Sequence, residues 1–474
     1  MQRVGQGRDI LCGVTTSLPS NGLGLFKSLF THFYDEEYEH IFSPMTTFWL
    51  MMYQRLNKDH TLDEAQQNVL DGGVNGLTPP GKVPPTRKSW HSYSTASYSN
   101  ARKRLEAIDL EEAFKIWTAD VAARISVTPI PSTKNCNLGE KFNNISVQLL
   151  DGTTFSAPRV GNIAETFSPA KNQHGESYWC QIRALAGFCP RSGILLSQVL
   201  GDQHISEQAQ CAQLFEAVKE PTLFVGDSNF GVYSVLERAD FYGHDLLTAL
   251  TEMRALKILG DNKLQPGEEC ELFWEPGRAD KLSPGSKPRS IKVRVLCQPI
   301  LKDGVEEYRY FMTTLIDSRT YPIDTLTDLY SYRWLAEINF LYLKTQMDMD
   351  IFNVKSAKMA TKEVLTGFHA YNMVRLAMWE TGQLKGLNPL RLSFSRCARA
   401  LLKRFQGLWT HNDCFARLPW TKFWSNLQRS IAKMGLPSRK KPRPNEPRKV
   451  RRRPLIYPAL IGSREKARVL LDPG

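Results

Sequence analysis

Apolar side chains recur at helical spacing in the first part of the chain. Between residues 25 and 75 they return every three or four positions, and the same spacing resumes after a Gly/Pro-rich break. A period near 3.6 residues predicts amphipathic α-helices. Arg102, Lys103 and Arg104 flank the second apolar stripe and give that helix a basic side. The pattern therefore predicts an all-helical region over residues 1–138 with one basic face.

The hydrophobic period changes after Pro131. Four short apolar runs typical of β-strands follow, with a helix-like segment between the third and the fourth. The runs lie at residues 145–150, 181–188, 194–200 and 223–225, and the helix-like segment lies at residues 207–219. Strands interleaved with helices predict a mixed α/β sheet with crossover helices over residues 139–260.

Turn residues and dense β-formers mark the next part of the chain. Glycines and prolines separate runs such as 291–296 and 308–315, which predict a strand-rich insertion over residues 261–320. Helical spacing then resumes over residues 321–380. Residues 381–474 are predicted as a helical C-terminal region that ends in an extended, basic Pro/Arg-rich tail.

Charge and composition narrow the class of protein. Across 474 residues, 61 Lys and Arg oppose 48 Asp and Glu, which leaves a formal net charge of +13. A surplus of this size favours polyanionic partners such as nucleic acid. The 42% hydrophobic content excludes wholesale disorder. No apolar run approaches the roughly 20 residues of a membrane span. We therefore expect a soluble, cytoplasmic protein that makes no use of a membrane.

Cysteine and histidine spacing gives no sign of a zinc site or a disulfide framework. The nine cysteines form no CxxC pair, and the nine histidines form no i, i+4 pair. We expect reduced thiols and, for any bound metal, oxygen ligands.

Four polar residues share one narrow face of a predicted helix: Tyr330, Arg333, Glu337 and Lys344. An α-helix turns by about 100° per residue, so side chains 3, 7 and 14 residues after Tyr330 point in nearly the same direction around the helix axis. One carboxylate among two cations and a phenol suits a metal-bound phosphate, with the glutamate as oxygen ligand and the cations as phosphate clamps. The alternative is an ordinary amphipathic helix with an i, i+4 salt bridge between Arg333 and Glu337.

Two aspartates, Asp151 and Asp227, each stand where an apolar strand run ends. Together with Glu337 they make three carboxylates, enough to hold two Mg²⁺ or Mn²⁺ ions about 4 Å apart for phosphodiester cleavage. Either aspartate alone is also a common turn residue.

The spacing YxxRxxxExxxxxxK from Tyr330 to Lys344 resembles the YREK signature of the DDE transposases of the insertion-sequence family IS-four. Asp151-Gly152 is similar to that family's first catalytic aspartate motif. The segment Gly-Asp-Ser-Asn-Phe-Gly at residues 226–231 is similar to the second, with a small change in the order of residues after Asp227. The resemblance extends over most of the chain up to about residue 400.

This resemblance implies an RNase H-like catalytic core that the β-rich insertion interrupts. It also implies an all-helical DNA-end-binding domain before the core and a helical region after it. Three residues are implied as catalytic metal ligands for Mg²⁺ or Mn²⁺, and three more as phosphate-binding residues. The ligands are Asp151, Asp227 and Glu337, and the phosphate-binding residues are Tyr330, Arg333 and Lys344.

The resemblance further implies double-stranded DNA as partner and a homodimer that synapses two element ends. Trp274, in the insertion, is the candidate acceptor of a flipped base, and the alternative is a core aromatic residue. Arg102 and Arg104 are candidates for the surface that recognises the terminal repeats, and the alternative is a solvated helix face. The basic tail is a candidate for sequence-independent phosphate contacts.

The sequence thus predicts a transposase that binds the terminal inverted repeats of an insertion sequence, cleaves DNA and transfers the strand into target DNA. One alternative is a metal-dependent nuclease of the RNase H-like superfamily. The other is a catalytically silent, transposase-derived DNA-binding protein.

Overall fold

The computed structural model divides the chain into two units, Met1–Gly435 and Leu436–Gly474. The residues that it describes are 29–30, 32–33, 40–78, 82–87, 94–132, 138–172, 175–262, 264–277, 288–302, 305–410 and 420–436. The basic tail predicted beyond residue 436 lies outside them.

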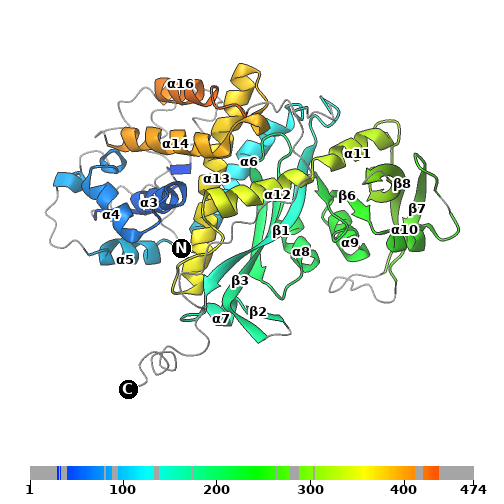
Figure 1. Cartoon of the computed structure of the whole chain (residues 1–474), viewed down its shortest axis with the longest axis horizontal. Helices are drawn as coiled ribbons and strands as arrows, with labels where there is room; N and C mark the ends of the chain where they lie inside the picture. The colour runs from blue at the N-terminus through cyan, green and yellow to red at the C-terminus, as the bar shows by residue number, and fades with distance from the viewer. Residues whose placement is uncertain are drawn as a thin grey trace. The chain divides into compact units, whose positions relative to one another are not determined.

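A mixed sheet occupies the middle of the chain (Figure 1). Its nine strands in the described residues run in the order β2-β3-β1-β5-β6-β9-β8-β7, and β4 pairs with β3 beyond the part of β3 that β2 covers. β1 lies antiparallel to β3 and parallel to β5, which is parallel to β6. The strands are β1 Ser146–Pro158, β2 Pro169–Asn172, β3 Gly175–Phe188, β4 Leu195–Asp202, β5 Thr222–Gly226, β6 Asp245–Leu250, β7 Glu269–Trp274, β8 Ile291–Lys302 and β9 Val305–Thr313.

The first predicted strand is longer than its apolar run. We expected a turn at Asp151-Gly152, and this expectation is wrong, because β1 continues through both residues to Pro158. Asp151 pairs with Ala186, and Gly152 pairs with Leu185, on the antiparallel neighbour β3. The pattern changes from apolar to polar because β1 loses its parallel neighbour β5 after Leu149.

The predicted strand-rich insertion does contain β7, β8 and β9. These strands extend the central sheet, because β9 pairs antiparallel with β6 through residues such as Thr313 and Leu247. Arg294 of β8 is fully buried and donates hydrogen bonds to the carbonyl oxygens of Leu315 (2.8 Å) and Tyr321 (3.0 Å). The insertion is thereby joined to the segment that leads into α11.

Helices cover the sheet and form the N- and C-terminal parts of the unit (Figure 1). Several begin at a side-chain cap, as where Ser43 accepts from the Thr46 N–H at 3.2 Å. The α-helices are α3 Pro44–Leu56, α4 Leu62–Leu70, α5 Ala96–Arg104, α6 Ala107–Ser126, α7 Ile163–Thr166, α8 Glu207–Ala217, α9 Tyr233–Phe241, α10 Glu252–Leu259, α11 Ile323–Ser331, α12 Trp334–Leu341, α13 Ala357–Lys385, α14 Phe394–Trp409 and α16 Trp420–Ile431. Short helical turns are η1 Asn75–Leu77, η2 Pro85–Arg87, η3 Tyr342–Gln346 and η4 Pro389–Arg391.

The long helix α13 is buried on nearly all sides and stands at the centre of the helical part. Helices α3, α6, α14 and α16 all pack against it. The apolar side chains of the N-terminal helices therefore belong to the same hydrophobic core as those of α13. The predicted helical region at residues 1–138 is helical where it is described, but it shares its core with residues far along the chain.

The predicted helix at residues 330–344 is interrupted. α11 ends at Ser331 and α12 begins at Trp334. Between them the backbone makes i→i−3 hydrogen bonds, from the Tyr332 N–H to Leu329 (3.0 Å) and from the Arg333 N–H to Tyr330 (2.9 Å). After Leu341 the chain widens into the π-helical turn η3. These changes of winding rotate Lys344 away from the direction that an ideal helix would give it.

In the described residues, no helix combines the length and the apolar character that crossing a bilayer requires. The cysteines described there are free thiols, as their spacing predicted: Cys180, Cys189, Cys211, Cys270, Cys297 and Cys397.

Candidate active site

Asp151 and Asp227 lie on neighbouring parallel strands. The register pairs Leu149 of β1 with Val225 of β5, and continuing it by two residues sets Asp227 beside Asp151. β5 is buried throughout and ends at Gly226, so Asp227 follows a strand end as predicted. The two aspartates are therefore close enough for the charge of Asp227 to act on the Asp151 carboxyl group.

The segment after Asp227 is held in a tight turn. The Asn229 N–H donates to Asp227 Oδ1 at 2.9 Å, and the Phe230 N–H donates to the Asp227 carbonyl oxygen at 3.1 Å. Arg254 of α10 donates to the carbonyl oxygen of Ser228 at 2.9 Å. This turn limits the directions in which the Asp227 carboxylate can point.

Asp151 carries a strongly perturbed carboxyl group. Its pKa is raised to about 7, chiefly by burial and also by the negative charges of Asp227 and Glu207. The Gly152 N–H, which donates to Asp151 Oδ1 at 2.9 Å, and the charge of Arg333 both lower it. A half-buried carboxylate among other carboxylates has the donor chemistry and the surplus negative charge that suit a divalent cation.

We expect the metal-free protein to lose stability as pH rises from 5 to 8, in part through Asp151. Its pKa of about 7 lies above its ordinary value, so the folded state binds this proton more tightly than the unfolded state. The stabilisation is complete at low pH and is lost as pH rises through 7. Thermal melting of wild type and Asp151→Asn in a chelator, at pH 5, 6, 7 and 8, measures the difference. Equal pH slopes for the two proteins would contradict the assignment.

Arg333 connects the third carboxylate to this pair. Arg333 donates to Glu337 Oε1 at 2.7 Å, and its charge also acts on Asp151. Arg333 directly precedes α12, which packs on β1, the strand that carries Asp151. The Glu337 side chain is 58% exposed, and Arg333 is the hydrogen-bond partner described for it. In the described residues, no three Asp, Glu, His or Cys side chains gather closely enough to form a ligand set.

Tyr330 and Lys344 take different positions. The Tyr330 ring packs on Phe311 of β9, with ring centroids 4.8 Å apart, and burial raises the pKa of its hydroxyl. Lys344 Nζ lies 3.7 Å from Asp350 and 5.9 Å from the ring centroid of Phe155 on β1. Phe155 is four residues beyond Asp151, or about 13 Å along the strand. Lys344 therefore stands farther along β1 than Arg333 and Glu337.

No sequence pattern indicated a second group of polar residues beside the aspartates. Glu207, at the start of α8, accepts from Asn229 Nδ2 at 2.8 Å, and a Cβ at Gly152 would lie 2.1 Å from its Oε1. Gln208 donates to both the carbonyl and the side-chain oxygen of Asn229, at 2.8 and 2.9 Å. This network joins α8 to the turn that holds Asp227.

We expect Asn229→Ala to weaken binding of Mn²⁺ about tenfold, because residues that orient metal ligands commonly have effects of this size. Without the Asn229 side chain, the turn after Asp227 loses its hydrogen bond to Glu207 and one of its two hydrogen bonds to Gln208. Calorimetric titration of the free protein with Mn²⁺ measures the change. Asn262→Ala, at an exposed position after α10, is the matched control. An unchanged Mn²⁺ affinity in Asn229→Ala would exclude the positioning role.

The other predicted DNA-contacting residues lie in different environments. Trp274 is only 8% exposed and packs edge-on against Tyr233, so it is a core aromatic residue in this structure. Arg102 is also 8% exposed and pairs with Glu363 of α13, which leaves it no free surface for DNA. Both observations correct the expectation of exposed contacts at these positions. Arg104, two residues on, is exposed.

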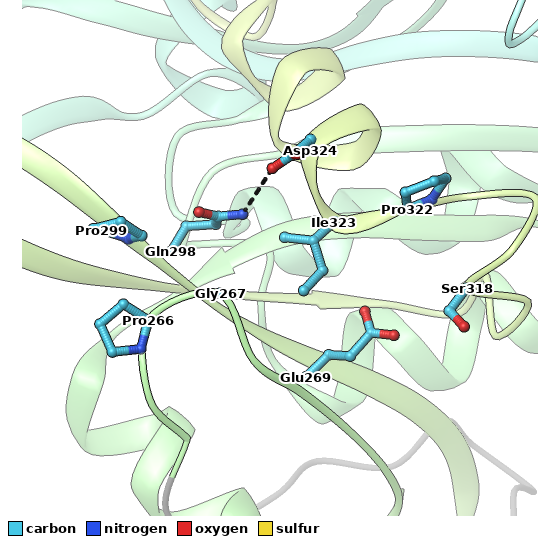
Figure 2. A pocket seen from close by; sticks show the side chains of 9 residues that line it. All are labelled: Pro266, Gly267, Glu269, Gln298, Pro299, Ser318, Pro322, Ile323 and Asp324. Atoms are coloured by element: carbon cyan, nitrogen blue, oxygen red, sulfur yellow. Dashed lines mark hydrogen bonds between the residues drawn. The ribbon is translucent and has the colours of Figure 1, made fainter.

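A cavity of about 620 Å³ lies apart from these carboxylates (Figure 2). It opens between the ends of β7 and β8 and the start of α11, where Gln298 donates to Asp324 at 3.4 Å. None of Asp151, Asp227 and Glu337 lines it. The candidate catalytic residues therefore lie on β1, at the end of β5 and on α12, and none of them lines this cavity.

Comparison with known proteins agrees with the site. Residues 143–373 match the family model described as the transposase DDE domain, an interval that contains all three carboxylates. The chain is similar to transposase InsG for insertion sequence element IS4 of Escherichia coli (strain K12), with 24% identity over 365 residues that cover 76% of each protein. A cryo-EM structure of a piggyBac transposase synaptic complex with hairpin DNA has 10% identity and a TM-score of 0.41, over 89% of this chain and 86% of that one. That structural likeness is too slight to define the fold.

The chain is therefore an enzyme of the DDE transposase class. Within this class it is similar to the IS4 transposase InsG, in agreement with the resemblance seen in the YREK motif.

Proposed function

We propose that this protein binds the ends of an insertion sequence, cleaves a phosphodiester bond there and joins the freed strand to target DNA. The observation that carries the proposal is the placement of Asp151 beside Asp227, with Arg333 linking this pair to Glu337. Water attacks the phosphorus atom at the element boundary, the bond from phosphorus to the 3′ oxygen breaks, and a 3′-OH is released. That hydroxyl then attacks the phosphorus atom of a target phosphodiester, and the 3′ oxygen of the target strand leaves as a new P–O bond joins the element end to the target.

The three carboxylates are the residues that would hold Mg²⁺ or Mn²⁺, two ions in each site. When bound, such ions lower the pKa of the attacking water and neutralise charge on the scissile phosphate. Asp151 and Asp227 are positioned by the sheet, whereas Glu337 reaches the site from α12. Arg333 has a planar guanidinium, which would be free to hold a phosphate oxygen when Glu337 binds a metal ion instead. Tyr330 and Lys344 would bind the phosphates on either side of the scissile phosphate.

We further propose that the core is RNase H-like. Five strands support this, in the order β4-β3-β1-β5-β6. The pairs β4–β3 and β3–β1 are antiparallel, and the pairs β1–β5 and β5–β6 are parallel. The strands β7, β8 and β9 fall between Asp227 and Glu337 in the chain, where the family resemblance predicts an insertion. A homodimer follows from the need to bring two element ends together.

The test is an assay with DNA that carries the ends of the element encoding this protein, together with a supercoiled plasmid as target. With Mg²⁺, the transposase proposal requires nicks at the repeat boundary and joined products, both abolished by a chelator. Cleavage without joining would favour the metal-dependent nuclease. Binding without any cleavage, in Mg²⁺ and in Mn²⁺, would favour the catalytically silent DNA-binding protein.

A further inference from the structure

The C-terminal helices carry positive charge without any opposing carboxylate. In the described residues from 381 to 436, nine side chains are Lys or Arg and none is Asp or Glu. All nine are exposed: Lys385, Arg391, Arg396, Arg399, Lys403, Arg404, Lys422, Arg429 and Lys433. A protein surface of one sign over this length creates a field that attracts polyanions.

α14 and α16, which carry most of these charges, pack against each other as an antiparallel pair (Figure 1). Leu392, before α14, bridges to Gly435, after α16, and the Ser393 N–H donates to the Met434 carbonyl oxygen at 2.9 Å. Their apolar sides are buried: on α14, Phe394, Cys397, Leu401, Phe405 and Trp409 face the core, and on α16, Trp424, Leu427 and Ile431 do so. The polar sides are thereby turned outward.

On each helix the cations fall on a common face. Arg396, Arg399 and Lys403 have spacings of three and four residues and lie within about 60° of one another around α14. Lys422 and Arg429, seven residues apart, lie within about 20° around α16. We call these five residues the basic face. Cβ atoms at i, i+3 and i+4 are about 5–6 Å apart, close enough to follow the phosphates of one DNA strand.

The basic face is not neutralised by its surroundings. None of its five cations forms an ion pair with a carboxylate in the part of the chain that the structure describes, and Arg399 bonds only the carbonyl oxygen of its own helix at Ser395. The carboxylates of Glu64 and Asp71 line a cavity of about 320 Å³ with Gln406 and Thr410, beyond the last cation of α14. These carboxylates therefore lie toward the C-terminal end of α14.

The buried side of α14 contacts the chain that follows α12. The Phe394 ring, at the start of α14, stacks on Tyr342 with ring centroids 4.8 Å apart and an interplanar angle of 17°. At about 100° per residue, the three cations of α14 lie on the opposite side of the helix from Phe394. The contact therefore fixes the start of α14, and the basic face points away from it.

We propose that the basic face binds the sugar-phosphate backbone of duplex DNA without reading its sequence. This inference rests on the proposed function, since it concerns DNA that the active site engages. Exposed Arg and Lys side chains supply contacts to phosphates, and such contacts position DNA without carrying sequence information. A membrane is disfavoured, because no large apolar side chain of α14 or α16 is exposed in the described residues.

The test compares two triple variants of the full chain that lose the same charge. One is Arg396→Gln, Arg399→Gln and Lys403→Gln. The control is Lys58→Gln, Lys115→Gln and Lys219→Gln, at exposed positions on other elements. Binding to a fluorescent 30-base-pair duplex without element ends is measured by anisotropy over a series of KCl concentrations.

We expect the basic-face variant to bind DNA at least tenfold more weakly at physiological salt. We also expect the slope of log affinity against log salt concentration to fall in magnitude by about 2 to 3, since each lost phosphate contact contributes about 0.9. The control is expected to stay within twofold of wild type. Equal affinity and slope for all three proteins, with melting temperatures unchanged, would overturn the proposal. So would a loss of binding to phosphatidylserine vesicles in the basic-face variant with unchanged affinity for DNA.

The two proposals fail in distinguishable ways. If the basic-face variant binds DNA like wild type and wild type still cleaves and joins element ends, only the basic-face proposal fails. If the variant loses DNA affinity but wild type neither cleaves nor joins, the transposase proposal fails and the basic face stands as a DNA-binding surface.

Discussion

Glu337→Gln is expected to lower Mg²⁺-dependent cleavage of element ends about a thousandfold, while DNA affinity stays within twofold. A ligand that helps to hold the metal contributes several kcal/mol to the transition state, which corresponds to a change of this size. The Glu337 side chain is 58% exposed, and Arg333 is the partner described for it, so its replacement removes little that stabilises the fold. Cleavage rates from single-turnover assays, with binding by anisotropy on the same DNA, measure both quantities.

The matched control is Glu216→Gln, which neutralises an exposed glutamate near the end of α8. It should cleave like wild type. If Glu337→Gln cleaved within tenfold of wild type, Glu337 would not be a metal ligand. The i, i+4 salt bridge with Arg333 would then be the whole role of this residue. If Glu337→Gln lost DNA binding together with cleavage, the residue would contribute to DNA binding instead.

Arg375→Leu is expected to destabilise the protein by about 3 kcal/mol. Arg375 is buried on α13 between three rings, at 5.0 Å from Tyr342, 5.5 Å from Tyr371 and 5.4 Å from Phe394. It donates to Asn339 Oδ1 at 2.5 Å and to the Tyr371 hydroxyl at 2.9 Å. Leucine removes the cation–π contacts and leaves the Asn339 oxygen buried without this donor.

Thermal melting measures this loss as a drop of several degrees. Arg391→Leu, at an exposed position of η4, makes the same substitution and should melt like wild type. Because Asn339 lies on α12 two residues after Glu337, we also expect weaker cleavage in Arg375→Leu at temperatures where it remains folded. Equal melting temperatures for Arg375→Leu and wild type would show that the contacts of Arg375 with the three rings and with Asn339 do not stabilise the fold.

Local patterns predicted much of this structure correctly. The apolar runs at 145–150, 223–225 and 291–296 all lie in strands, because a buried strand is selected for apolar residues over its own few positions. The spacing of Arg333 and Glu337 predicted their contact, since residues four apart on a helix are neighbours. The same motif identified the family.

Other features depended on partners far away in the chain. The Asp151-Gly152 segment has the composition of a turn, yet it remains in a strand because β3 pairs with it. Arg102 has the spacing of a solvated helix face, yet it is buried against Glu363, 261 residues later. Trp274 is covered by Tyr233, on a helix that precedes the insertion. A short stretch of sequence cannot predict these contacts, because the partner residues lie far away in the chain.

The amino-acid sequence alone determined the class of this protein, because carboxylates and cations at particular spacings are chemical requirements visible along the chain. Tertiary structure alone decided which of those residues meet and which remain exposed. It set Asp151 beside Asp227 through strand pairing, interrupted the helix before Glu337 and turned Lys344 toward Phe155. The physical reason is that burial and pairing arise when distant elements pack together, whereas hydrophobic periodicity reports only which side of one element is covered.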